Sequence, residues 1–125
     1  MADDERLICA SEALTERGPG VRFPLRTWNG EEKGFVVRHG GRACAYVNQC
    51  PHAGTELDWQ PGEFFDLAGV YLVCATHGAL FEPGSGLCVA GPCRGAALRP
   101  LEVRESHGKI VLVSETPAEV TRTRP

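Results

Sequence analysis

Four residues in the middle of the chain have side chains that bind metal ions, and they occur as two closely spaced pairs. Cys50 and His52 form the first pair in Cys-Pro-His, and Cys74 and His77 form the second in Cys-Ala-Thr-His, with 21 residues between the two pairs. Each pair follows a run of residues typical of a β-strand, so each is expected on a loop that leaves a strand. Two loops that each offer one thiolate and one imidazole suit a binuclear iron–sulfur centre, in which one iron binds both thiolates and the other binds both imidazoles.

Three other uses of these four residues stay open at this point. A single zinc ion binds two Cys and two His, although zinc loops favour pairs of one kind, such as C-x2-4-C with H-x3-5-H. The residues could also be packed thiols with unrelated histidines. Finally, a Cys–His pair could act in nucleophilic catalysis, but no orienting third residue or oxyanion loop accompanies it. The mixed pairing favours the binuclear centre.

The two pairs resemble the ligand boxes of the Rieske family, which binds a [2Fe–2S] cluster with His replacing Cys on one iron. The similarity continues in Gly54, in residues 78–81, and in Gly91-Pro92-Cys93, which resembles the proline loop that covers the cluster in this family. It extends more weakly over residues 7–113. The resemblance implies four cluster ligands, which are Cys50, His52, Cys74 and His77. The role of Cys93, next to the presumed cover, stays open.

The chain differs from the high-potential respiratory members of that family. Those members have the patterns C-x-H-x-x-C and C-x-C-H, in which two further cysteines join the loops by a disulfide. In this chain Thr55 and Thr76 occupy the positions of those two cysteines. Ala79 and Phe81 replace the Ser and Tyr hydroxyls that those members place near the cluster sulfurs. The resemblance therefore implies a low-potential cluster without a loop disulfide, with a potential of about −150 to 0 mV.

Period-two alternation of apolar and polar residues dominates the chain, and no long helical pattern appears. A single helical turn with a Ser cap is predicted at residues 11–16. Strands are predicted at residues 7–10, 21–27, 35–38, 42–48, 70–73, 79–81, 87–89, 101–105 and 109–113. Many short strands separated by Gly and Pro predict an all-β fold, with a small antiparallel sandwich or barrel as its base. The resemblance implies the Rieske fold, in which a cluster-binding lobe is inserted into such a base.

The length of 125 residues suits a single Rieske domain over residues 1–125. The lobe is expected at about residues 49–94, with tails at about 1–5 and 116–125. Short apolar stretches and an acidic start predict no membrane span and no export signal, so the cytoplasm is the expected compartment. Cysteines in a reducing compartment are expected as ligands or packed thiols. The packed thiols would be Cys9, Cys44 and Cys88.

Charge is distributed unevenly along the chain. Residues 43–93 contain five acidic residues and no Lys or Arg, which gives −5, while eleven acids and thirteen bases elsewhere give +2, for a net −3. The sequence lacks the cluster of basic residues that would indicate a nucleic-acid partner. The acidic segment either serves solubility or forms a docking lobe for basic partners. Within it, the long loop 53–73 either packs its aromatic residues on the base or forms a partner-specific surface.

The resemblance implies a soluble Rieske-type ferredoxin that is not itself an enzyme. It would carry one electron from a flavin-dependent reductase to a terminal oxygenase or a similar acceptor. A small Rieske subunit or redox-sensing module of a larger reductase complex is the alternative. A Rieske oxygenase is a weaker one, because it needs a mononuclear iron held by two further histidines, and only His39 and His107 remain.

Overall fold

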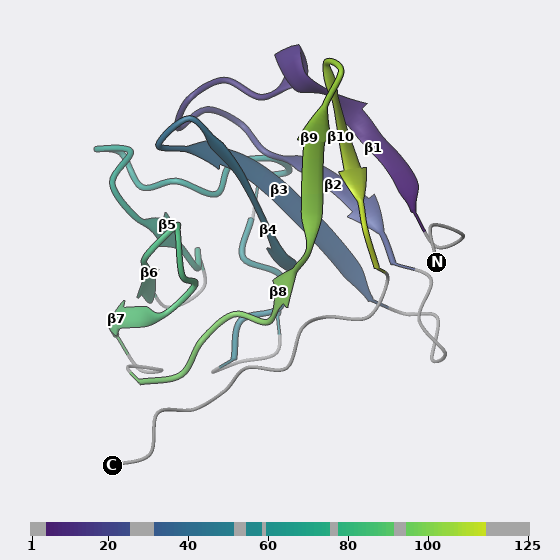
Figure 1. The fold of residues 1–125 in the computed structure, drawn as a ribbon. Helices are drawn as coiled ribbons and strands as arrows, with labels where there is room; N and C mark the ends of the chain where they lie inside the picture. The colour runs from purple at the N-terminus through teal and green to yellow at the C-terminus, as the bar shows by residue number, and fades with distance from the viewer. Residues whose placement is uncertain are drawn as a thin grey trace.

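The computed structural model describes residues 5–25, 32–51, 55–58, 60–75, 78–91 and 95–114, and these are built almost entirely from β-strands (Figure 1). The strands are β1 (Arg6–Ala10), β2 (Val21–Pro24), β3 (Lys33–His39), β4 (Arg42–Val47), β5 (Leu72–Val73), β6 (Leu80–Phe81), β7 (Cys88–Ala90), β8 (Pro100–Leu101), β9 (Val103–Ser106) and β10 (Lys109–Leu112). They form three sheets, of order β1-β10-β9, β2-β3-β4-β8 and β5-β6-β7. Every pairing between these strands is antiparallel, which confirms the predicted all-β antiparallel fold.

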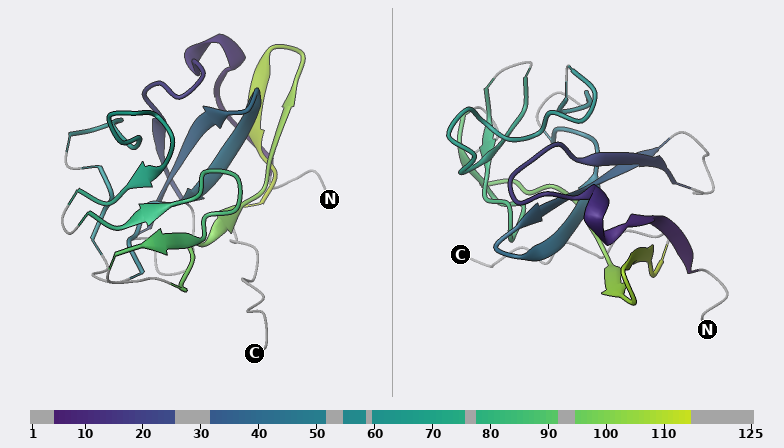
Figure 2. Two further views of the ribbon diagram at one scale, coloured as in Figure 1. Left: turned by 90° about the vertical axis from the view of Figure 1, so that its left-hand side faces the viewer. Right: turned by 90° about the horizontal axis from the view of Figure 1, so that it is seen from above.

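The sheet of β2, β3, β4 and β8 is the middle layer of the molecule. Because side chains alternate along a strand, Val36 points to one face of β3, while Phe35 and Val37 point to the other. All three are fully buried. Val36 packs with Ile110 and Leu112 of β10, whereas the opposite face of β3 packs against the lobe that carries β5, β6 and β7. The views in Figure 2 show this arrangement, with the lobe on one side of β3 and β4 and the β9–β10 hairpin on the other.

Each of the nine predicted strand segments overlaps an observed strand, but the segment 101–105 is divided. Pro100 pairs with Tyr46 of β4, whereas β9 pairs with β10. The chain therefore passes from one sheet to another at Glu102, a change that periodicity along one segment does not reveal. The predicted helical turn is also shorter than expected: it is a 3-10 turn over Ser11–Ala13. The predicted Ser cap is wrong, because Ala10 holds the N-cap position and no side chain caps the turn.

Two hairpins contain the tight turns that the glycine pattern predicts. Gly40 and Gly41 join β3 to β4 with φ of 64° and 78°. His107 and Gly108 join β9 to β10 with φ of 55° and 74°. Positive φ at both central residues is typical of the turn that matches the twist of a two-residue hairpin. The sequence offers two further turns with glycine. Gly84-Ser85-Gly86 lies between β6 and β7, with φ of 78° at Gly86, and Asn29-Gly30 lies outside the described residues.

The long connection between the two predicted ligand pairs packs on the middle sheet through Phe64. This side chain is fully buried, and its ring stacks on that of Phe35 with centroids 3.9 Å apart and an interplanar angle of 13°. The next residue, Phe65, stacks on His39 of β3 at 6.3 Å, so His39 is half-buried although it borders a hairpin turn. Leu67, at the tip of the connection, is fully exposed. The base of this loop therefore belongs to the core and its tip to the surface, while Trp59 lies outside the described residues.

No helix in the described part of the chain is long and apolar enough to cross a membrane.

Candidate metal centre

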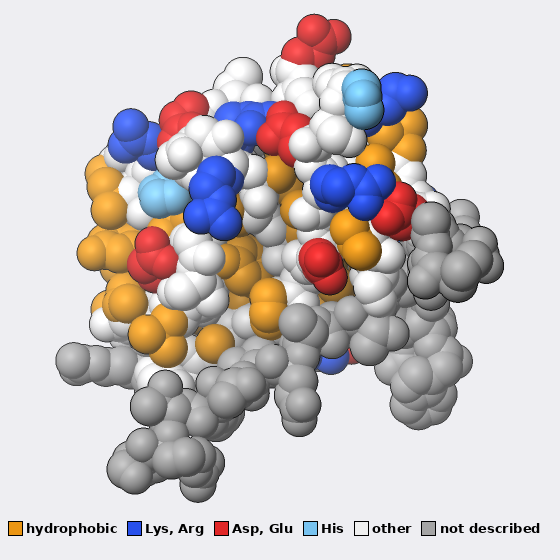
Figure 3. Space-filling view, viewed as in Figure 1, with side chains coloured by type: hydrophobic (Ala, Val, Ile, Leu, Met, Phe, Trp, Pro, Cys, Tyr) orange, Lys and Arg blue, Asp and Glu red, His pale blue; other side chains and the backbone are white. Residues whose placement is uncertain are grey.

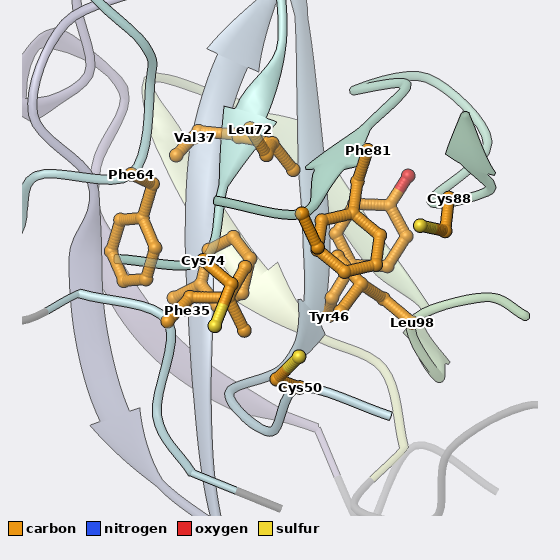
Figure 4. Close-up of a cluster of buried hydrophobic side chains, with 12 residues drawn as sticks. Phe35, Val37, Tyr46, Cys50, Phe64, Leu72, Cys74, Phe81, Cys88 and Leu98 are labelled. Carbon is orange, nitrogen blue, oxygen red and sulfur yellow. The ribbon is translucent and has the colours of Figure 1, made fainter. Parts of the chain in front are cut away.

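Cys50 and Cys74 lie together at one end of the core between the middle sheet and the lobe. Cys50 is three residues past the end of β4, and Cys74 directly follows β5, so both are on loops that leave strands, as predicted. Only 1% of Cys50 and 0% of Cys74 is exposed, and both belong to one buried cluster. Figure 4 shows both sulfur atoms on the same side of this cluster. Two thiols that are distant in sequence are thus brought to one apolar site.

The two loops have the same backbone hydrogen bond. The N–H of Cys50 donates to the carbonyl of Thr55 at 2.7 Å, and the N–H of Cys74 donates to the carbonyl of Ala79 at 2.9 Å. Each cysteine is therefore bonded to the fifth residue after it. A further bond joins the loops directly, since the N–H of Ala75 donates to the carbonyl of Leu57 at 3.0 Å. We refer to residues 48–58 as the first loop and to residues 74–79 as the second loop.

His52 and His77 lie outside the described residues, as do Gly54, Thr76 and Cys93. Among the residues that the structure does describe, no three His, Cys, Asp or Glu side chains converge into a metal-binding group. Of the four predicted ligands, the structure therefore describes the two thiols, Cys50 and Cys74. The described neighbours of the two histidines, Pro51, Ala75 and Gly78, are exposed.

The surroundings of the thiols are apolar. Leu57, Ala79 and Phe81 are fully buried in the same cluster as both thiols, whereas Pro92, of the segment that resembles the proline loop, lies outside the described residues. The positions at which Ser and Tyr hydroxyls were noted in respiratory relatives are thus occupied by buried methyl and phenyl groups. The one tyrosine of this cluster, Tyr46, donates its hydroxyl to the carbonyl of Pro83 at 2.7 Å. Burial raises the pKa of Tyr46, so the hydroxyl keeps its proton and this bond at ordinary pH.

A buried polar pair, Asn48 and Asp58, closes the first loop, and sequence reasoning did not identify it. The side-chain amide of Asn48 donates to Asp58 Oδ1 at 2.9 Å, and Asn48 Oδ1 accepts from the backbone N–H of Leu57 at 2.8 Å. Asp58 Oδ2 accepts from the N–H of Gly62 at 2.8 Å and lies 3.4 Å from Nε of Arg22. The only local signal is that Asn and Asp often cap loops through their side chains.

The three cysteines predicted as packed thiols form no disulfide with another described cysteine and lie in or near the core. Cys88 is buried, whereas Cys9 and Cys44 are half-buried. Burial raises the pKa of the Cys9 and Cys44 thiols, which keeps them protonated and poor metal ligands. The prediction of packing is therefore confirmed for Cys88 and only partly for the other two.

An all-β frame with two buried thiols on matching loops is typical of small β-domains that bind an iron–sulfur cluster. Comparison with known proteins identifies the class: the family described as the Rieske [2Fe-2S] domain matches residues 5–116. The chain therefore belongs to the Rieske [2Fe–2S] domain family, and its cofactor is a [2Fe–2S] cluster. The Oxidoreductase NdmD of Pseudomonas putida is 31% identical over 105 residues, which cover 78% of this chain and 17% of that protein.

Solved structures share the fold at lower identity. The ferredoxin of carbazole 1,9a-dioxygenase from Nocardioides aromaticivorans IC177 superposes with a TM-score of 0.71 at 22% identity, covering 90% of this chain and 99% of the ferredoxin. The terminal oxygenase of carbazole 1,9a-dioxygenase from Novosphingobium sp. KA1 superposes with a TM-score of 0.72 at 24% identity, covering 90% of this chain and 30% of the oxygenase. Both a stand-alone ferredoxin and part of an oxygenase thus have this fold.

The described residues fit the thiolate half of such a cluster. Two buried thiols share one apolar site, which excludes water from the sulfur atoms. The hydrogen-bonded backbone of both loops fixes the positions from which the thiols project.

Gly91 lies close to the second loop, and this contact can be tested. It has φ of 102°, and a Cβ atom there would lie 2.8 Å from Cα of Ala79. Since backbone cannot yield as a side chain can, Gly91→Ala should destabilise the fold by about 2–4 kcal/mol, combining strain with overpacking. Gly95→Ala is the matched control, because its φ is 94° but a Cβ would meet nothing within 4 Å. Urea denaturation that gives equal losses for the two variants would contradict close packing on the second loop.

Proposed function

We propose that this protein is a Rieske-type ferredoxin that carries one electron from a flavin-dependent reductase to a terminal oxygenase or a similar acceptor, without a reaction of its own. The observation that carries the proposal is the convergence of Cys50 and Cys74 on matching loops within a chain of the Rieske family. A bound [2Fe–2S] cluster would supply one-electron redox chemistry. The chain would bind it through Cys50, His52, Cys74 and His77, with the thiolates on one iron and the imidazoles on the other.

The exposure of the two loops supports a route for the electron through the histidines. The thiols are buried, whereas Pro51, Ala75 and Gly78, which flank the histidines in sequence, are exposed. In this arrangement the protein shields the cluster on its thiolate side and presents the imidazole side to a partner. We assign His52 and His77 as the exit for the electron.

The oxygenase as acceptor is supported by a structural relative. A solved complex of reduced oxygenase and oxidized ferredoxin in carbazole 1,9a-dioxygenase contains a chain with this fold. The compartment we assign is the cytoplasm, because no disulfide joins any of the cysteines in the described part of the chain, as expected in a reducing environment.

Removing a ligand should remove the cluster. Cys50→Ala, His52→Ala, Cys74→Ala and His77→Ala should each lose both irons and both sulfides, because each deletes one of four bonds that hold the cluster. Cys44→Ala and Cys88→Ala should keep the full content. Iron and acid-labile sulfide analysis measures this loss. EPR of the reduced wild-type protein should show the low average g-value of a mixed His/Cys cluster, whereas a zinc protein would give no signal at all.

The apolar surroundings predict a potential at the low end of the family range, about −150 to 0 mV. Buried Ala79 and Phe81 offer no hydroxyl donor to the cluster sulfurs, and fewer donors stabilise the reduced state less. A redox titration followed by circular dichroism or EPR measures the midpoint. A value above about +150 mV would show that other donors compensate.

The docking surface we assign is a groove on the lobe, and it refines the acidic lobe that the sequence predicts. Ion pairs among the described residues neutralise part of the acidic segment: Arg22 and Lys33 lie 3.0 and 3.6 Å from Glu56, and Asp58 is buried. No such pair reaches Glu63 or Asp66 within that part of the chain. Both line the groove, whose walls are Gln60, Glu63, Phe65, Asp66, Leu67, Val73 and Ala75.

The groove combines apolar and acidic groups beside the second loop. Leu67 is fully exposed, and Figure 3 shows hydrophobic surface gathered over the side of β5, β6 and β7. Ala75, in the groove wall, directly follows Cys74. A partner with a basic side chain next to an apolar one would complement this surface and approach the cluster closely.

Reversing the charge of Glu63 should slow docking. At low salt, Glu63→Lys should reduce the second-order rate of reduction by a flavin-dependent reductase by about threefold to tenfold, because it removes part of the steering field. Stopped-flow measurement at increasing salt should bring variant and wild type together as the field is screened. Glu12→Lys makes the same charge change at an exposed site on the 3-10 turn and should have little effect. Wild-type rates that do not depend on salt would contradict electrostatic docking.

A small Rieske module of a larger reductase complex is the second candidate, and one observation favours it. The curated relative is an oxidoreductase of which this chain spans only 17%. A tight, constitutive complex with a reductase subunit would support the module, whereas rapid exchange of electrons with a dissociable reductase would support the carrier.

A further inference from the structure

We propose that Asn48 and Asp58 are positioning residues for the cluster: with Arg22 as counter-ion, they form a side-chain clasp that holds the first loop closed. In the respiratory members described above, a disulfide joins the two loops. Here Thr55 occupies the position of the cysteine in the first loop. The inference rests on the proposed role of Cys50 and His52 as ligands.

The clasp joins the two ends of the segment that carries both predicted ligands. Asn48 and Asp58 are ten positions apart, and Asn48 bonds to the carboxylate at 2.9 Å and to the N–H of Leu57 at 2.8 Å. Both residues are buried, with 5% and 4% exposed. Removing the partner of a buried polar group lowers the stability of a protein more than removing the partner of an exposed one. The closed form of this loop is therefore strongly favoured.

The clasp also connects the first loop to the rest of the molecule. Asp58 Oδ2 accepts from the N–H of Gly62, and the carbonyl of Gly62 accepts from the N–H of Gly20 at 2.8 Å, next to β2. Arg22 of β2 brings its Nε to 3.4 Å from the same carboxylate, whose side chain is fully buried. On the other side, the carbonyl of Leu57 accepts from Ala75 of the second loop. A change at Asp58 is therefore transmitted to both loops.

A reciprocal exchange tests the clasp. Asp58→Asn keeps a single acceptor oxygen, so it cannot accept from both Asn48 and Gly62, and it also removes the negative charge that faces Arg22. Asn48→Asp places two carboxylates together. Each single variant, purified with its cluster, should release iron to a chelator at least about tenfold faster than wild type and show altered g-values in EPR. The double variant Asn48→Asp/Asp58→Asn re-forms the bond with donor and acceptor exchanged. It should return the release rate to within about threefold of wild type.

The matched control is Glu56→Gln. Glu56 pairs with the same arginine at 3.0 Å, but its side chain is 41% exposed. This variant should release iron at the wild-type rate with wild-type g-values, because exposed pairs contribute little. Release as fast as in Asp58→Asn would show that loss of any charge near Arg22 has the same effect, and would overturn the clasp.

Two further outcomes decide the proposal. Single variants with wild-type release and g-values, or a double variant no better than the worse single one, would overturn it. If the single variants do not fold, Arg22→Gln on the edge strand β2 removes the counter-ion of Asp58 together with the exposed pair to Glu56, which the Glu56→Gln control isolates. Unchanged iron release in Arg22→Gln would also overturn the proposal. A wild-type protein that binds no [2Fe–2S] cluster would instead contradict the proposed function, so the two failures are distinguishable.

Discussion

The burial of β3 and β4 on both faces is the constraint on which the remaining structure depends. A strand exposes alternate side chains to opposite faces, so Val36 can pack on β10 only while Phe35 and Val37 pack on the lobe. A slip of one residue in the register with β4 would exchange the two sets, and neither core would form. The same register fixes the point at which the chain leaves β4, three residues before Cys50. The position of the first loop thus follows from the packing of a sheet that contributes no ligand.

The lobe separates apolar from charged surroundings over a short distance. The thiols, Leu57, Ala79 and Phe81 are shielded from water in the core, whereas Glu63 and Asp66 face the groove on the outside. Charges act more strongly across a low-dielectric interior than across water. Glu63 and Asp66, which form no ion pair with another described residue, therefore keep their charge at the surface, while Asp58, inside, is held by hydrogen bonds and Arg22.

Local sequence features predict the strands and the positions of the thiols, because alternation, turn glycines and ligand spacing are encoded within short segments. The Gly40-Gly41 hairpin and the loops of Cys50 and Cys74 are examples. Features that depend on which distant segment supplies the partner are not encoded in this way. The division of strand 101–105 between two sheets, the stacking of Phe64 on Phe35, and the pairing of Asn48 with Asp58 all arise from tertiary contacts. The predicted positions of His52 and His77 stay predictions, since both lie outside the described residues.

The direct link between the two loops, from the N–H of Ala75 to the carbonyl of Leu57, is a hydrogen bond rather than a covalent bridge. Such a link forms as soon as the chain folds and needs neither an oxidant nor an isomerase. Its strength is also independent of the thiol–disulfide poise of the surroundings, so glutathione at any physiological ratio leaves it intact. Neither Cys50 nor Cys74 contributes its sulfur atom to this link, so the link leaves both thiols available for the ligand role proposed for them.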